Sequence, residues 1–227
     1  MIGIIGAMAL ETDAIIRELE APQSETISGV RFVKGGWCGK EVVVATSGVG
    51  KVFAALCAEA MILRYQPDCI INTGVAGALA PELHLLNVVI GEDVVQHDMD
   101  TSPVGDPLGL LSGINKIELP ADAALNARFE KAAAALGITT LRGRIASGDQ
   151  FIADDAKRTF IRETFGGACC EMEGAAIGQV CYVNEVPFAV LRAISDGAAD
   201  DAKMDYPAFA AKAAEQSIKI LKKGLED

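Results

Sequence analysis

The chain alternates short aliphatic runs with longer segments in which apolar residues recur every three or four positions. The aliphatic runs, which predict buried strands, lie at 1–6, 68–73, 88–95, 139–146 and 188–191. Helical periodicity marks 7–20, 51–65, 122–136, 174–184 and the stretch after Asp205-Tyr206-Pro207, which we expect to cap the last helix. Two further strands, 30–34 and 41–46, are predicted to pair around a glycine-rich turn.

Strands that alternate with helices in this way are typical of α/β proteins. We therefore predict an α/β fold, namely a three-layer α/β/α domain around a central, largely parallel twisted sheet. The sequence contains no internal repeat and no linker, so this single domain is expected to span residues 1–227.

The run from Pro187 to Asp196 combines a buried strand with charged residues at its end. In open α/β sheets the carboxyl ends of the strands face the ligand crevice. We therefore expect Arg192 and Asp196 to lie where a substrate binds. The alternative is an Arg–Asp ion pair that only stabilises the end of the strand.

Four other strand ends carry residues that are unusual for a core. Glu11 follows the first strand, and Met8 lies on the same helical face, three residues away. The small residues of Gly74-Val75-Ala76-Gly77 would let the backbone approach another group closely. Glu173 follows another strand end. The convergence of such residues on one edge of the sheet indicates a site.

The fourth of these strand ends, at residue 146, is followed closely by Phe151 and Ile152. This pair either forms a flat apolar wall for an aromatic base or closes the top of the core, and the segment itself supports both interpretations.

Composition and charge exclude several classes of function. The formal net charge of −11 argues against a nucleic-acid or anionic membrane partner. The six cysteines show no C-x-x-C spacing and the chain has only two histidines, so we expect neither disulfides nor a metal site. The N-terminus lacks the basic region of a signal peptide, and no apolar run reaches about 18 residues, which favours a cytoplasmic protein.

The glycine-rich stretches do not match cofactor-binding motifs. Ser47-Gly48-Val49-Gly50-Lys51 lacks the first glycine and the final Ser or Thr of a phosphate-binding loop, and Gly3-Ile-Ile-Gly6 is not G-x-G-x-x-G. We therefore predict no nucleotide cofactor, and close backbone packing is the expected use of these glycines.

Carboxylates and one arginine are thus the groups available for chemistry. Pairs of carboxylates hydrolyse glycosidic bonds, because one protonates the leaving group while the other orients water at the anomeric carbon. A flat apolar wall beside them suggests a nucleobase as the leaving group. The residues themselves support an N-ribosyl hydrolase or a related transferase.

The chain also resembles the nucleoside phosphorylase/hydrolase superfamily, and specifically the 5′-methylthioadenosine/S-adenosylhomocysteine nucleosidases. The resemblance spans almost the whole length and is carried by Ile4-Ile5-Gly6-Ala7-Met8 with Glu11, Ser47-Gly48-Val49-Gly50-Lys51, Ile71-Asn72-Thr73-Gly74, Ser147-Gly148-Asp149, Glu171-Met172-Glu173 and Arg192-Ala193-Ile194-Ser195-Asp196.

This resemblance implies a nucleoside phosphorylase-like fold and hydrolysis of 5′-methylthioadenosine, S-adenosylhomocysteine or both. It implies that Asp196 protonates N7 of adenine as the bond to C1′ breaks. Glu11 would activate the water, and Arg192 would help to hold it. Ser195, in the same motif as Asp196, is assigned to substrate binding.

The remaining implied contacts concern the sugar and the base. Glu173 would bind the ribose hydroxyls, and Met172 would pack against the sugar. Phe151 would stack on adenine while the backbone of Ile152 reads its edge. Met8 is expected to face the same crevice.

Two segments bear on the details of catalysis and assembly. Val75 stands where members of this family often carry serine, so a hydroxyl that could help hold the water is missing. The segment 99–113 corresponds to the region that reaches across a dimer and covers the 5′ substituent. We therefore expect a homodimer with this segment near the partner active site.

Two other functions are compatible with this fold. A purine nucleoside phosphorylase would need arginines placed to bind phosphate, and the sequence offers no convincing cluster. A nucleoside-binding sensor without catalysis is opposed by the joint presence of Glu11, Glu173 and Asp196.

Overall fold

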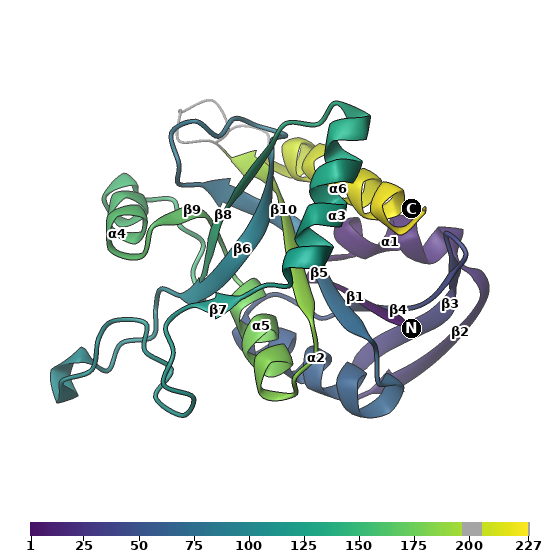
Figure 1. Cartoon of the computed structure of the whole chain (residues 1–227), viewed down its shortest axis with the longest axis horizontal. Coiled ribbons are helices and arrows are strands. Elements are labelled where there is room, and N and C mark those ends of the chain that lie inside the picture. Colours follow the sequence, from purple (N-terminus) through teal and green to yellow (C-terminus); the bar gives the residue numbers. More distant parts are fainter. Residues whose placement is uncertain (197–205, 227) are drawn as a thin grey trace.

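The computed structural model describes residues 1–196 and 206–226 (Figure 1). Its helices are α1 (Ala9–Glu18), α2 (Lys51–Tyr65), the short 3-10 helix η1 (Ser102–Val104), α3 (Ala123–Leu136), α4 (Asp155–Phe165), α5 (Gly174–Val183) and α6 (Tyr206–Glu226). Its strands are β1 (Ile2–Gly6), β2 (Glu20–Ile27), β3 (Val30–Trp37), β4 (Lys40–Thr46), β5 (Cys69–Ala78), β6 (Val88–Gln96), β7 (Leu119–Pro120), β8 (Thr140–Ser147), β9 (Gly167–Glu171) and β10 (Phe188–Asp196). The predicted cap at Asp205 lies outside the described residues.

The sheet is mixed, so the prediction of a largely parallel sheet is wrong. Within the described residues, five strand pairings are parallel and five are antiparallel. The short connections from β2 to β3 and from β3 to β4 account for two antiparallel pairings, because a tight turn returns the chain in the opposite direction. Two more arise where β9 meets β5 and where β6 meets β10.

Strand β10 pairs with both β5 and β6, and this double pairing closes part of the sheet on itself. The strand order β10-β6-β8-β9-β5 therefore forms a ring, and β1, β4, β3 and β2 extend from β5. All nine residues of β10 are buried, as expected for a strand with neighbours on both edges and helices on its faces. The ring brings the ends of β5, β8, β9 and β10 close together.

Helices cover both faces of the sheet (Figure 1). One apolar cluster joins the strands to α2 and α5, whose buried side chains include Met61 and Ile177. A second cluster joins the other face to α1, α3 and α6, whose buried side chains include Ile15, Phe129 and Leu221. Helix α4 packs through Ile161 and Phe165 in a third cluster near Ile152.

The local signals predicted most helices well. Asp122 caps α3 by accepting a hydrogen bond from the Leu125 N–H at 2.8 Å, and Gly137 ends that helix in the left-handed conformation. At the start of α2, Gly48 and Gly50 have φ values of +93° and +101°. Glycine adopts this conformation at little cost, which explains the motif without a bound phosphate.

Strand β2, helix α4 and the short elements η1 and β7 were not predicted, and of β9 only its end beside Glu173 was. Strand β2 is the last strand of the path, and most of its side chains are exposed, so it lacks the alternation that marks a half-buried strand. Helix α4 and strand β9 follow each other across the single residue Gly166, which takes the left-handed conformation. The predicted strand at 68–73 also continues through the small residues to Ala78.

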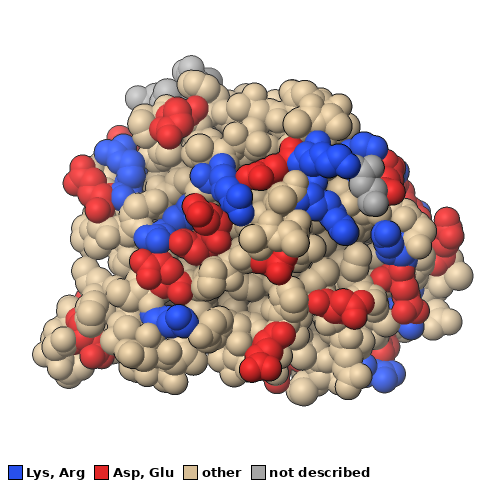
Figure 2. Space-filling model, in the orientation of Figure 1, with Lys and Arg blue, Asp and Glu red and all other residues tan. Residues whose placement is uncertain are grey.

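In the described part of the chain, no helix combines the length and the apolar character that a membrane span requires. Acidic and basic side chains are interspersed on the face drawn in Figure 2. Ion pairs of the molecule include Arg144 with Asp93 and Lys222 with Glu18.

Candidate active site

A cavity of 170 Å³ lies where the ends of β1, β4, β5, β8, β9 and β10 meet. It is lined by Ala7, Met8, Glu11, Val49, Val75, Ala76, Gly77, Phe151, Cys170, Glu171, Met172, Glu173, Ser195 and Asp196. The structure therefore brings together eight of the ten site residues predicted from sequence. The other two, Arg192 and Ile152, lie in the adjoining core.

Glu11 is held as a fixed acceptor in the first turn of α1, where it is 1% exposed. Its Oε2 accepts hydrogen bonds from the backbone N–H groups of Ala7 at 2.7 Å and Met8 at 2.9 Å. Its Oε1 accepts one from the N–H of Val75 at 3.1 Å. Burial raises the pKa of Glu11, although Arg192 and these three donors lower it.

Asp196 ends β10 and has a different environment, in which two side chains of the described part of the chain contact its carboxyl group. Ser195 Oγ lies 3.1 Å from its Oδ1, and Arg158 of α4 donates to its Oδ2 at 3.1 Å. Burial raises the pKa of Asp196 and outweighs the hydrogen bond from Ser195 and the charge of Arg158, which lower it. A buried carboxyl with a raised pKa is suited to hold a proton and donate it.

Arg192 is 1% exposed and is surrounded by acceptors. Its Nη2 contacts Glu171, donates to Asn72 Oδ1 at 2.5 Å and lies 3.6 Å from Glu173 Oε2. Burial alone would lower the pKa of Arg192, but the neighbouring carboxylates raise it. Arg192 and Asp196 thus contact different residues, so the alternative of a simple Arg–Asp pair at the strand end is wrong.

Glu173 shares this charged cluster and sits immediately before α5, 4% exposed. Its Oε1 accepts a hydrogen bond from the N–H of Gly50 at 2.8 Å, which links the glycine-rich motif to the cavity. Burial and the charge of Glu171 raise the pKa of Glu173 to about 7. A partly protonated carboxyl can both donate to and accept from hydroxyl groups.

Two glycines make room for these side chains, as the predicted close approach requires. A Cβ atom at Gly74 would overlap Arg192 and would lie 2.7 Å from Glu11 Oε1. A Cβ atom at Gly77 would lie 2.9 Å from Asp196 Oδ2. The small residues of β5 therefore form the floor on which the charged groups rest.

Phe151 lies as a wall for a flat ligand would, whereas Ile152 closes the core. Phe151 is 62% exposed and lines the cavity, as a wall for a flat ligand would. Ile152 is 5% exposed and packs in the cluster with Ile161 and Phe165 of α4. Met8 and Met172 line the cavity as well, and both are partly exposed.

Two residues of the site have no predicted role. Glu171 was recognised only as part of a motif, yet it contacts Arg192 and Ser147 and accepts hydrogen bonds from the N–H groups of Glu173 and Gly174. Arg158 carries no sequence signal, because α4 was not predicted. Among the described residues, no group of histidine, cysteine or carboxylate side chains could hold a metal ion.

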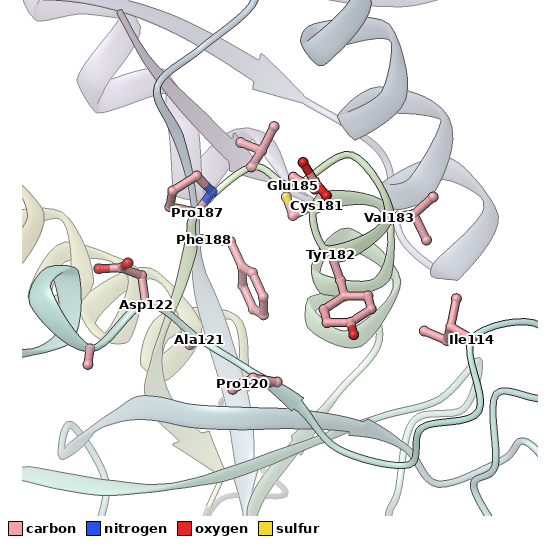
Figure 3. A pocket seen from close by; sticks show the side chains of 12 residues that line it. Ile114, Pro120, Ala121, Asp122, Cys181, Tyr182, Val183, Glu185, Pro187 and Phe188 are labelled. Carbon is pink, nitrogen blue, oxygen red and sulfur yellow. The ribbon is translucent and has the colours of Figure 1, made fainter.

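A larger hollow of 710 Å³ lies at the start of β10 and beside α5 (Figure 3). The rings of Tyr182 and Phe188 lie beside it, together with Pro120 and Ile114. Of its carboxylates, Asp122 is engaged as the cap of α3. This hollow lacks the convergent buried carboxylates of the smaller cavity, so we place the candidate active site in the latter.

Comparisons with known proteins agree on the family. The family model described as "Phosphorylase superfamily" matches residues 1–226. The chain is 43% identical over 218 residues to a protein of Shewanella pealeana named 5′-methylthioadenosine/S-adenosylhomocysteine nucleosidase, and the match covers 95% of this chain and 94% of that protein.

Solved structures give the same result. A nucleosidase of that name from Neisseria meningitidis, in complex with methylthio-immucillin-A, superposes with a TM-score of 0.94 at 32% identity and covers 99% of this chain and 98% of its own. A futalosine hydrolase from Helicobacter pylori superposes with a TM-score of 0.93 at 36% identity, covering 99% and 97%. The chain therefore has the nucleoside phosphorylase-like α/β fold with a mixed sheet, and it belongs to the phosphorylase superfamily, among the 5′-methylthioadenosine/S-adenosylhomocysteine nucleosidases.

Proposed function

We propose that this chain hydrolyses the N-glycosidic bond of 5′-methylthioadenosine, S-adenosylhomocysteine or both and releases adenine. The observation that carries the proposal is that Glu11 and Asp196 line one cavity in unlike environments. Three backbone donors favour the charged form of Glu11, whereas Asp196 is contacted, among the described residues, by the hydroxyl of Ser195 and the guanidinium of Arg158. Differing environments are how one site assigns a base and an acid to two carboxyl groups.

In the proposed mechanism, Asp196 donates its proton to N7 of adenine while the bond to C1′ breaks. The ribosyl group gains positive charge as the bond lengthens, and nearby carboxylates stabilise this charge most strongly in the transition state. Glu11 accepts a proton from the attacking water, with Arg192 supporting its charge. The products are adenine and the free 5′-substituted ribose.

The other lining residues bind the substrate in this proposal. Glu173 accepts and donates hydrogen bonds to the ribose hydroxyls, and Met172 and Met8 pack against the sugar. Phe151 stacks on adenine, and the backbone of Ile152 contacts its edge. Ser195 orients the carboxyl of Asp196, to which it lies at hydrogen-bond distance.

Water rather than phosphate is the proposed nucleophile. No lysine or arginine is among the described residues that line the cavity, and a phosphorylase requires cations there to bind its second substrate. Val75 offers an N–H to Glu11 but no hydroxyl to the water. Glu11 therefore carries more of the task of orienting the water in this chain.

We also propose that the chain forms a homodimer through the exposed face of α2 and α5. Val52 and Leu63 of α2 are 76% and 70% exposed, and Val183 of α5 is 59% exposed. These two helices pack against each other. The segment 99–113 extends from the rest of the chain in Figure 1, and Val104 within it is 82% exposed. Such a segment can reach a neighbouring subunit and cover the 5′ substituent of its substrate.

The first prediction concerns the products. Incubation with 5′-methylthioadenosine should yield adenine and free methylthioribose at a rate that does not depend on phosphate, measured by chromatography with and without phosphate. S-adenosylhomocysteine and futalosine, tested in parallel, define the preferred substrate. Cleavage that strictly requires phosphate would assign the chain to the phosphorylases, and binding of all three without cleavage would favour a sensor.

The second prediction concerns Asp196. Replacement by asparagine keeps the shape of the side chain but removes the acidic proton, so turnover should fall by roughly 100- to 10,000-fold. Binding of an adenosine analogue, measured by calorimetry, should be largely retained. Asp13→Asn, at an exposed position of α1, is the matched control and should behave as the wild type. Normal turnover of Asp196→Asn would remove this residue from the mechanism.

The third prediction concerns Glu11. Glu11→Gln removes the charge that activates water, and turnover should again fall by roughly 100-fold or more. Because burial raises the pKa of Glu11, wild-type activity should decline on the acid side at a pH above the ordinary value of about 4.3 for glutamate. The measurement is a pH profile of kcat/KM, with the exposed Glu163→Gln as control. Full activity of Glu11→Gln would mean that another base acts.

The fourth prediction concerns assembly. Light scattering of the wild-type chain should give the mass of a dimer, and the double variant Val52→Glu/Leu63→Glu should shift it towards the monomer, because burying a charge at an interface is costly. Leu136→Glu places the same charge on α3, at a position 42% exposed, and should leave the dimer intact. A wild-type chain that is monomeric at working concentration would contradict the proposal.

A further inference from the structure

The general acid of the proposed mechanism is contacted by an arginine that does not come from one of the strand ends. Arg158 lies on the first half of α4, and its Nη2 donates to Asp196 Oδ2 at 3.1 Å. The two side chains are 15% and 12% exposed, so solvent screens this ion pair only partly. We infer that Arg158 is a positioning residue that controls when Asp196 carries the proton it must donate.

The inference rests on the proposed function and adds to it a residue that contacts the acid rather than the substrate. An arginine beside a carboxyl group favours its charged form. A general acid must hold its proton before it can act, so Arg158 opposes protonation of Asp196 while burial promotes it. The balance between the two sets the upper pH limit of activity.

The other described groups around Asp196 do not supply a positive charge. Ser195 is neutral and lies on the same strand. Cys169 and Cys170 of β9 have pKa values raised by burial, so their thiols are neutral in the working pH range. Gly77 of β5 is the register partner of Asp196 and contributes backbone only.

The geometry also indicates that Arg158 acts on the charge of Asp196 and not on its location. The backbone of Asp196 is fixed by the pairing of β10 with β5, opposite Gly77. The side chain is further held by Ser195. Removing the guanidinium of Arg158 should therefore change the protonation of Asp196 while leaving the strand in place.

The guanidinium group of Arg158 also contacts the segment that is proposed to bind adenine. Arg158 Nε donates to the carbonyl oxygen of Ile152 at 3.2 Å, directly after Phe151, which lines the cavity. One side chain thus ties the segment that faces the base to the acid that would protonate it.

The test is the pH profile of kcat/KM for 5′-methylthioadenosine in the wild type and in Arg158→Met. The alkaline limb of such a profile reports the essential acid of the free enzyme. In Arg158→Met this limb should move to higher pH by about one unit or more, because an adjacent arginine lowers the pKa of an aspartate by roughly 1–3 units. Arg158→Lys keeps the charge and should retain a limb near that of the wild type.

Arg162→Met is the matched control. Arg162 lies four residues further along α4, is 41% exposed and pairs with Glu163 rather than with the site. Its profile should equal that of the wild type. An alkaline limb that stays in place, or moves to lower pH, in Arg158→Met would overturn the inference.

A second measurement separates this inference from the proposed function. The carboxyl carbon of Asp196, labelled with ¹³C, reports its protonation directly by NMR in the wild type and in Arg158→Met, with or without turnover. Asp196 should titrate at higher pH in the variant, and equal titration would overturn the role of Arg158. A wild type that cleaves no nucleoside would refute the proposed function while leaving this titration to decide the inference on its own.

Discussion

The site depends on one buried cation and the three carboxylates that face it. Arg192 is 1% exposed, and the charges of Glu171, Glu173 and Glu11 all act on it. Removing ions from water costs several kcal/mol each, and attraction inside the protein offsets this only when further hydrogen bonds satisfy the remaining groups. Asn72 and the N–H groups at the start of α5 provide such bonds.

One cation cannot neutralise three carboxylates, and the excess negative charge has a consequence for protonation. Glu173, which lies next to Glu171, has its pKa raised to about 7. Glu11 also has a raised pKa, but its three backbone donors favour the anion. Burial, together with this excess negative charge, therefore leaves the carboxyl group of Glu173 partly protonated near neutral pH.

A sequence pattern reports on nearby residues more reliably than on contacts between distant segments. This difference decides how much of the fold and of the site could be predicted. Local patterns sufficed for the helix from Ala123 to Leu136, whose cap and terminal glycine lie within the segment itself. The strand-end argument identified Glu11, Glu173 and Asp196, because residues directly after buried strands converge wherever the strands share an edge. The ring closed by β10 could not be predicted, since it depends on pairing between strands far apart in the chain.

The ion-pair partners of the charged side chains in the site were the least predictable part. The sequence left an ion pair between Arg192 and Asp196 open as an alternative, yet Arg192 contacts Glu171, Glu173 and Asn72. Among the described residues, the cation that contacts Asp196 is Arg158, which lies 38 residues away in the chain on α4, a helix that was not predicted. Periodicity locates a strand end to within a residue or two, but ion-pair partners are chosen by side-chain reach in the folded chain.

The two arginines lie apart and therefore act on different carboxyl groups of the site. Arg192 extends from the middle of the ring, is fixed by buried acceptors and offsets the charge of the carboxylates that must remain available near the sugar. Arg158 extends from a peripheral helix and contacts the carboxyl proposed to exchange a proton, together with the carbonyl oxygen of Ile152. A cation locked in the core suits a charge that stays constant through the reaction, because moving it would disrupt several buried bonds at once. A cation on α4, whose side chain is 15% exposed against 1% for Arg192, can rearrange with less disruption and suits a charge that must change.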